Sequence, residues 1–85
     1  MTAARVAVEL YVYYKLARRD TARLRELAAQ FPSVALFVKD GGDPELPTWM
    51  EIHRGPQAEA DAQALGDALM GLIVGTRHVE RFRPA

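Results

Sequence analysis

The side chains best suited to acid–base chemistry lie in three short stretches of this chain. Within each stretch they are two residues apart, as Tyr11 and Tyr13, Glu51 and His53, and His78 and Glu80. Histidine changes charge near neutral pH with little help, because its unperturbed pKa is about 6.5. A glutamate beside an aromatic ring can reach the same range through desolvation. Two-residue spacing puts both members of a pair on one face of a strand, so these residues form a candidate proton-transfer or ligand site if the strands are neighbours.

The strands that would hold these pairs are visible as alternating apolar residues. The alternation predicts strands over residues 6–14, 34–39 and 48–53, and a shorter strand over 78–82. Apolar residues of the first strand, from Val6 to Val12, are expected to face the core. The run Asp40–Pro47 is rich in turn-forming residues, so the second and third strands should form a hairpin.

Two stretches with helical spacing separate these strands. The first begins at Asp20, whose carboxylate suits an N-cap, and ends before Pro32. The second carries an apolar stripe from Ala58 to Ile73, with Gly75 as the expected C-cap. Gly66 and Gly71 are expected inside this helix, where glycine is unfavourable, and therefore indicate a close contact between helix and sheet.

The element order β-α-β-β-α-β predicts the fold. A chain of 85 residues is expected to form a single domain over residues 1–85. Two right-handed crossovers around a hairpin give a ferredoxin-like α+β fold, with a four-stranded antiparallel sheet in the order 4-1-3-2 and two helices on one face. The opposite face of the sheet has no helix to cover it.

Alternation also predicts which side chains lie on the uncovered face. They are Glu9, Tyr11, Tyr13, Phe37, Lys39, Trp49, Glu51, His53, His78, Glu80 and Phe82. With the third strand taken to run in the direction of the first, they form the rows His78–Tyr13–His53, Glu80–Tyr11–Glu51 and Phe82–Glu9–Trp49. In the fourth strand this assignment has Val79 facing the helices. Arg77 and Arg81 share the parity of Val79, so they too are expected on the covered side of the sheet.

We interpret the uncovered face as an interaction surface. So many exposed aromatic rings are unusual for a monomer, and tyrosine and tryptophan suit protein interfaces. The prediction is a small bacterial interaction module of unknown cellular role that homodimerises through this face. Its candidate residues, for a ligand or a dimer partner, are Tyr11, Tyr13, Trp49, Glu51, His78 and Phe82.

The alternative is a small-molecule-binding protein or cofactor-free enzyme that takes a small aromatic ligand at the same face. The residues leave open whether the chain is an enzyme. No phosphate loop, dinucleotide fingerprint or His-Glu-x-x-His motif occurs, so no cofactor is expected. The pairs Glu51-x-His53 and His78-x-Glu80 supply metal-ligand types. Their strands would lie about 10 Å apart, too far for ligands that must come within about 2.2 Å of zinc, so no metal is expected.

The charge composition of the chain argues against two kinds of binding partner. The chain has 11 basic and 11 acidic residues, and this neutral balance argues against nucleic acid and membrane surfaces, which attract basic proteins. RNA-recognition domains stack bases on comparable strands, but Glu9, Glu51 and Glu80 would repel phosphate. There is no cysteine, no apolar run near the about 20 residues of a membrane span, and no signal-like start at Met1–Arg5. A cytoplasmic location is therefore expected.

Three segments of the chain resemble an uncharacterised family of small proteobacterial proteins, a domain of unknown function. The segments are ELYVYY (9–14), TWMEIH (48–53) and RHVERF (77–82). Members of that family usually carry tyrosine where this chain has His53. The resemblance implies a compact α+β domain of the bacterial cytoplasm and no particular activity. The expected fold is also similar to the dimeric α+β barrel group, whose subunits join through their sheets; that similarity makes the enzyme alternative monooxygenase- or isomerase-like.

Overall fold

The computed structural model describes residues 8–85 and has the predicted order of strands and helices. Val6, which was predicted to begin the first strand, lies outside the described residues. The elements are β1 (Glu9–Leu16), a short 3-10 turn η1 (Arg18–Asp20), α1 (Thr21–Ala28), β2 (Val34–Val38), β3 (Thr48–His53), α2 (Ala58–Ala68) and β4 (Ile73–Phe82).

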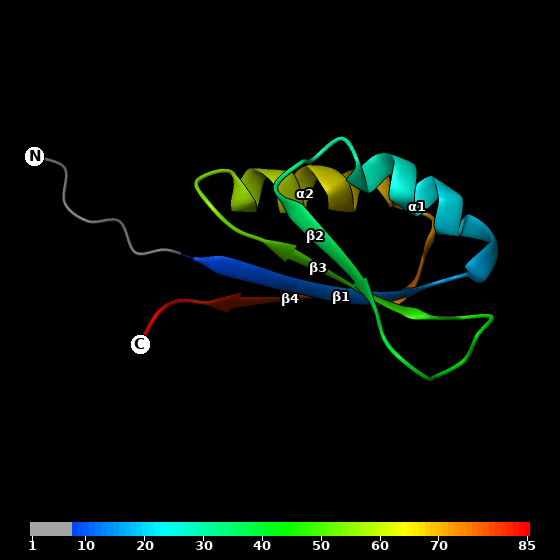
Figure 1. Cartoon of the computed structure of the whole chain (residues 1–85). Coiled ribbons are helices and arrows are strands. Elements are labelled where there is room, and N and C mark those ends of the chain that lie inside the picture. Colours follow the sequence, from blue (N-terminus) through cyan, green and yellow to red (C-terminus); the bar gives the residue numbers. More distant parts are fainter. Residues whose placement is uncertain (1–7) are drawn as a thin grey trace, which may run out of the picture.

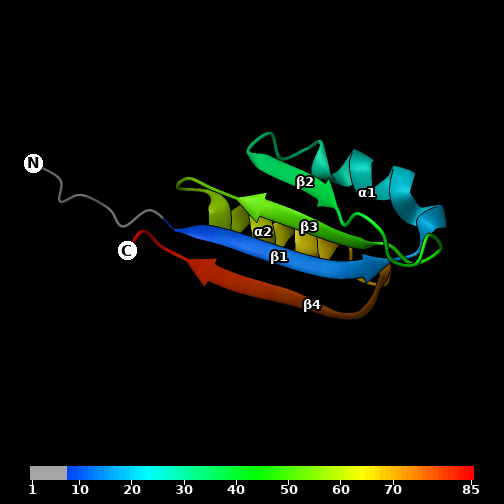
Figure 2. The same cartoon turned by 60° about the horizontal axis from the view of Figure 1, so that its bottom comes forward.

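The four strands form one antiparallel sheet in the order β2-β3-β1-β4. Both helices lie on one face of this sheet (Figure 1), and turning the molecule brings the other face forward with no helix in front of it (Figure 2). The predicted ferredoxin-like fold is therefore confirmed.

The direction of β3 differs from the one used to predict the rows on the uncovered face. Leu10 pairs with His53 and Lys15 pairs with Thr48, so β1 and β3 run in opposite directions. The crossover through α1 returns the chain parallel to β1 in β2, and the β2–β3 hairpin then reverses it. The assumption that β3 runs with β1 was wrong.

The apolar core lies between the sheet and the helices. The inward side chains of β1 are Leu10, Val12, Tyr14 and Leu16, and each is at most 2% exposed. They pack against apolar residues of both helices, chiefly Leu24, Leu27, Ala62 and Leu65. Helices this short are marginal by themselves, so their stability depends on this contact with the sheet. Within residues 8–85, neither helix is long and apolar enough to span a bilayer.

The boundary between α2 and β4 differs from the prediction. The helix stops at Ala68, and β4 begins at Ile73 and continues for 10 residues. Gly71 was expected inside the helix but follows it, and a Cβ built there would meet nothing within 4 Å, so the close contact predicted at Gly71 was wrong. Its φ of +90° is favourable only for glycine, and it turns the chain back toward the sheet. Gly75 is therefore not the C-cap; it lies within β4, where the pairing with β1 shifts between Tyr13 and Lys15.

The first helix begins at the predicted residue without the predicted contact. Asp20 is the N-cap of α1, but its carboxylate makes no capping hydrogen bond. Its backbone (φ −96°, ψ 5°) continues the η1 turn instead of adopting the extended conformation that capping side chains normally use. The helix ends at Ala28, ahead of Pro32 as expected.

Candidate functional site

β1 and β4 place Tyr11, Tyr13, His78 and Glu80 on the uncovered face in the predicted register. Tyr13 pairs with His78 and Tyr11 pairs with Glu80. The Tyr13 ring stacks on the His78 imidazole with 4.7 Å between centroids, and the Tyr13 hydroxyl donates to Glu80 Oε2 at 3.3 Å. The negative charge of Glu80 raises the pKa of the Tyr13 hydroxyl. The outward orientation predicted for His78, Glu80 and Phe82 is confirmed.

A second group occupies the end of the face near the start of β1. The Tyr11 hydroxyl donates to Glu9 Oε1 at 2.8 Å, and Arg54 Nε donates to Glu9 Oε2 at 3.0 Å. The hydrogen bond from Tyr11, aided by the charge of Arg54, lowers the pKa of the Glu9 carboxyl. The Phe82 ring meets Tyr11 edge to face at 5.1 Å and remains 51% exposed. This end of the face therefore combines satisfied polar groups with an open aromatic ring.

β3 presents the opposite set of side chains from the one predicted. Trp49, Glu51 and His53 point toward the helices and are 5%, 0% and 1% exposed, so their predicted place on the uncovered face was wrong. Paired residues on neighbouring strands share a face, and Glu51 pairs with the buried Val12. The uncovered face receives Thr48, Met50 and Ile52 from β3 instead.

β2 completes the face with Phe37, as predicted. Phe37 pairs with Met50 and is 54% exposed. Lys39 follows the strand, and its backbone N–H donates to the Thr48 carbonyl at 2.8 Å. Phe37, Met50 and Tyr13 help to line a shallow hollow of about 490 Å³ on this face. The middle of the face is thus apolar, and its charged groups lie toward the edges.

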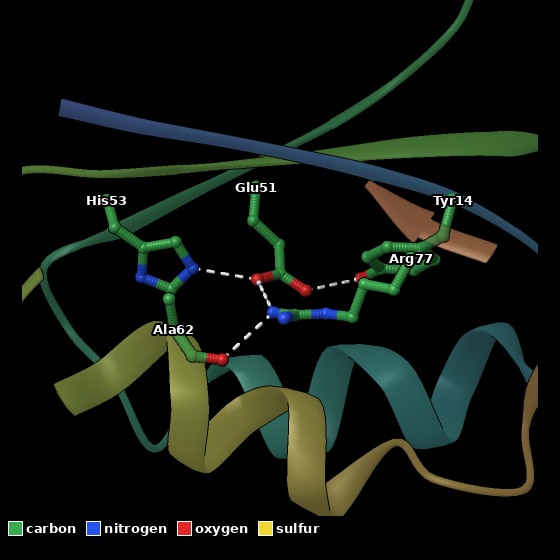
Figure 3. Close-up of polar contacts among 5 residues, drawn as sticks. All are labelled: Tyr14, Glu51, His53, Ala62 and Arg77. Carbon is green, nitrogen blue, oxygen red and sulfur yellow. Dashed lines mark hydrogen bonds and ion pairs between the residues drawn. The ribbon is translucent and has the colours of Figure 1, made fainter. Parts of the chain in front are cut away.

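Two of the side chains that β3 turns inward, Glu51 and His53, form a buried polar cluster with Tyr14 and Arg77 (Figure 3). The Glu51 carboxylate accepts hydrogen bonds from the Tyr14 hydroxyl at 2.6 Å and from Arg77 Nη2 at 2.8 Å, and His53 Nε2 lies 2.7 Å from Oε1. Burial, reinforced by the charge of Glu51, raises the pKa of the Tyr14 hydroxyl above its ordinary value.

Arg77 connects the cluster to the helix layer. Besides its ion pair with Glu51, its Nη2 donates to the Ala62 carbonyl of α2 at 3.0 Å (Figure 3). A Cβ built on Gly66 would lie 2.7 Å from Arg77 Nη1, so a larger residue there would displace the guanidinium from this position. This confirms the close contact predicted at Gly66. Through Arg77 the cluster connects the sheet to α2. The Glu51 carboxylate is fully shielded from solvent, so its role within this fold is structural.

The two pairs considered as metal ligands are separated by the sheet itself. Glu51 and His53 lie on the covered face, whereas His78 and Glu80 lie on the uncovered one. In residues 8–85, no three histidine, aspartate or glutamate side chains are grouped in a way that could hold a metal ion.

No family model matches the chain, and no curated protein matches its sequence. Among solved structures, the C-terminal domain of the MgtC protein from Mycobacterium tuberculosis aligns with a TM-score of 0.57 at 10% identity, covering 98% of this chain and 94% of that one. A de novo designed protein, Foldit4, aligns with a TM-score of 0.55 at 17% identity, covering 93% and 97%. A dimeric ferredoxin-like protein of unknown function from Thermobifida fusca aligns with a TM-score of 0.50 at 12% identity, covering 99% and 96%. These similarities establish the fold, and the resemblance to known proteins is supported at that level alone.

Proposed function

We propose that this protein is a small interaction module that homodimerises through the uncovered face of its sheet. The observation that carries the proposal is the pair of half-exposed rings, Phe37 and Phe82, on a face whose middle also holds Met50 and Ile52. A contiguous apolar patch of this kind on a small protein commonly marks an interface. The dimeric state of the Thermobifida fusca protein with the same fold supports a second copy as the occupant.

Burying the exposed rings of this face contributes favourably to association. Fully burying an exposed phenylalanine is worth about 1.5–3 kcal/mol, so covering a ring that is half exposed contributes about 1 kcal/mol. A symmetric dimer buries Phe37 and Phe82 of both copies, and these four rings together contribute about 4 kcal/mol before Met50 and Ile52 are counted. That gain opposes the loss of translational and rotational freedom on binding.

Several polar groups of the face already have hydrogen-bond partners within the chain. Glu9 already has Tyr11 and Arg54 as partners, and Glu80 accepts a hydrogen bond from Tyr13. Tyrosines with satisfied hydroxyls and apolar rings are typical of interface centres. The same two carboxylates oppose a nucleic acid partner, because they would repel phosphate. A location in the bacterial cytoplasm is part of the same proposal and rests on the sequence segments alone.

The test is the absolute mass in solution, measured by light scattering after size exclusion from micromolar to near-millimolar concentration. We expect twice the chain mass of 9.5 kDa for the wild type and a single chain mass for Phe82→Asp and Phe37→Asp. Met70→Asp is the matched control: Met70 is 77% exposed but follows α2 in the helix layer, so this variant should remain dimeric. A wild type that stays at 9.5 kDa throughout the range would refute the proposal.

A second candidate is a small aromatic ligand bound at the same face. It is favoured by the Tyr13 hydroxyl beside Glu80 and the His78 imidazole stacked on the Tyr13 ring, an arrangement that suits proton transfer to or from a ring substituent. Phenol and indole are suitable probes, and their binding can be followed by chemical-shift changes at Tyr13 and His78. Under this alternative His78→Ala abolishes the shifts while the dimer persists; an absence of shifts in the wild type excludes it for these probes.

A further inference from the structure

Two adjacent rows of side chains cross the uncovered face, and their ends are complementary. The row through Tyr11 consists, from β2 to β4, of Ala35, Ile52, Tyr11 and Glu80. The row through Tyr13 consists of Phe37, Met50, Tyr13 and His78. One row thus begins with a methyl group and ends in a carboxylate, while the other begins with a large ring and ends in an imidazole.

A second copy can cover this face in two symmetric ways if the strands stay aligned, as they do within about 30° in packed sheets. A two-fold axis parallel to the strands lays β4 on β2 of the other copy, so that Glu80 meets Ala35 and His78 meets Phe37. An axis that crosses the strands lays β4 on β4 in the reverse direction, so that each row meets the other. Glu80 then meets His78, and Ala35 meets Phe37.

The chemistry of the row ends distinguishes the two arrangements. The parallel axis buries the Glu80 carboxylate against a methyl group with no cation nearby, which is unfavourable. The crossing axis gives that carboxylate an imidazole partner and sets a small side chain opposite a large one, as close packing requires. It also places Lys15, which lies near the end of β1, opposite Glu9 at the start of β1 in the other copy.

We infer that the dimer is antiparallel, with its two-fold axis crossing the strands between the Tyr11 and Tyr13 rows, and that Glu80 of each copy pairs with His78 of the other. This inference rests on the proposed homodimer and adds its geometry. Tyr11 of one copy then lies on Tyr13 of the other at the centre of the interface. Two equivalent Glu80–His78 contacts lie beside this centre, one on each side of the two-fold axis, at the edge where β4 covers β4 of the other copy.

A heterodimer experiment tests the pairing without relying on charge compensation within one chain. In a His78→Glu homodimer, two glutamates face each other at both contacts; in a Glu80→Lys homodimer, lysine faces histidine. When the two variants are mixed, the carboxylate introduced by His78→Glu meets the ammonium group introduced by Glu80→Lys, and the second contact keeps its native Glu80 and His78. We therefore expect the mixed dimer to be about tenfold tighter than either variant homodimer, measured by sedimentation with a fluorescent label on one variant.

The outcomes separate this inference from the proposal on which it depends. A dimeric wild type whose two variants mix only statistically, with unchanged affinities, would overturn the antiparallel arrangement and leave the homodimer standing. A monomeric wild type would overturn both. Glu45→Lys is the matched control, because Glu45 is exposed at the hairpin tip, away from the face; mixed with His78→Glu, it should give no preferred heterodimer. His78 and Glu80 are both exposed, and far-UV circular dichroism checks that the variants fold.

Discussion

Replacing Glu51 by glutamine should remove a large part of the free energy of unfolding, because it leaves a buried arginine without its counterion. The Arg77 side chain is 17% exposed, and Glu51 is fully buried and is its only ion-pair partner within residues 8–85. Breaking a buried pair from one side costs about 3–5 kcal/mol. Glutamine also offers a single acceptor oxygen where the carboxylate has two for Tyr14, His53 and Arg77. A chain of 85 residues has about 4–13 kcal/mol of stability in total, so this loss is a large fraction of it.

The assay is urea unfolding followed by the fluorescence of Trp49, the only tryptophan, which is 5% exposed and lies on the covered face with the cluster. Glu45→Gln is the control: it removes an equally charged group from an exposed ion pair and should change the unfolding free energy by less than about 1 kcal/mol. The double variant Glu51→Leu with Arg77→Met removes both charges and should recover the part of the loss that comes from the unpaired guanidinium, while Tyr14 and His53 still lose their partner. A loss below about 1 kcal/mol for Glu51→Gln would refute the view that this ion pair holds sheet and helix together.

Two further predictions concern the same cluster. Gly66→Ala should destabilise the protein, although alanine favours helix by about 1 kcal/mol, because its Cβ would meet Arg77 Nη1 at 2.7 Å. In an Arg77→Met background the same change should become stabilising. Urea unfolding of the wild type, the two single variants and the double variant measures this reversal. Burial and the charge of Glu51 raise the folded-state pKa of the Tyr14 hydroxyl above its ordinary 10.0. The contribution of Tyr14 to the free energy of unfolding is therefore intact below about pH 10, and it is lost at higher pH by about 1.4 kcal/mol per pH unit. Tyrosinate absorbance at 295 nm should show one of the three tyrosines ionising only with unfolding, and Tyr14→Phe should remove that alkaline loss; a Tyr14 that titrates in the folded protein would contradict its burial.

Much of the fold follows from local patterns that point the same way. In β1, residues Leu10, Val12 and Tyr14 are apolar and their neighbours are mixed, so the covered face is unambiguous. Its register with β4 could be predicted because His78 and Glu80 alternate around Val79. The end of α2 could not be predicted, because the apolar spacing of the helix continues through the turn that follows it. Gly71, which ends the helix, is recognised only from its positive φ.

The orientation of β3 could not be read from its own residues. Either alternation set contains apolar side chains, and polarity alone favours burying Met50 and Ile52 over Glu51 and His53. The structure buries the polar set because Tyr14 of β1 and Arg77 of β4 supply hydrogen bonds to Glu51. Such long-range compensation has no local periodicity.

Two signals did point to a buried acidic partner. Arg77 shares its parity with Val79, which directs the guanidinium toward the helices, and Gly66 provides the space that the guanidinium occupies. An arginine in such a position requires a carboxylate nearby, because an unpaired buried charge is unfavourable. Taken together they indicate a buried acidic partner for Arg77, and the structure shows that this partner is Glu51.

The inward turn of β3 determines what the uncovered face can bind. It withdraws a carboxylate, an imidazole and an indole from that face and supplies Thr48, Met50 and Ile52 in their place. The acid–base groups that remain there come from β1 and β4, where Glu80 and His78 occupy neighbouring rows. A central apolar band with acid and base at one edge is self-complementary under an antiparallel two-fold axis. The polar cluster beneath the helices thus leaves β3 with an outer surface suited to a second copy of the same sheet.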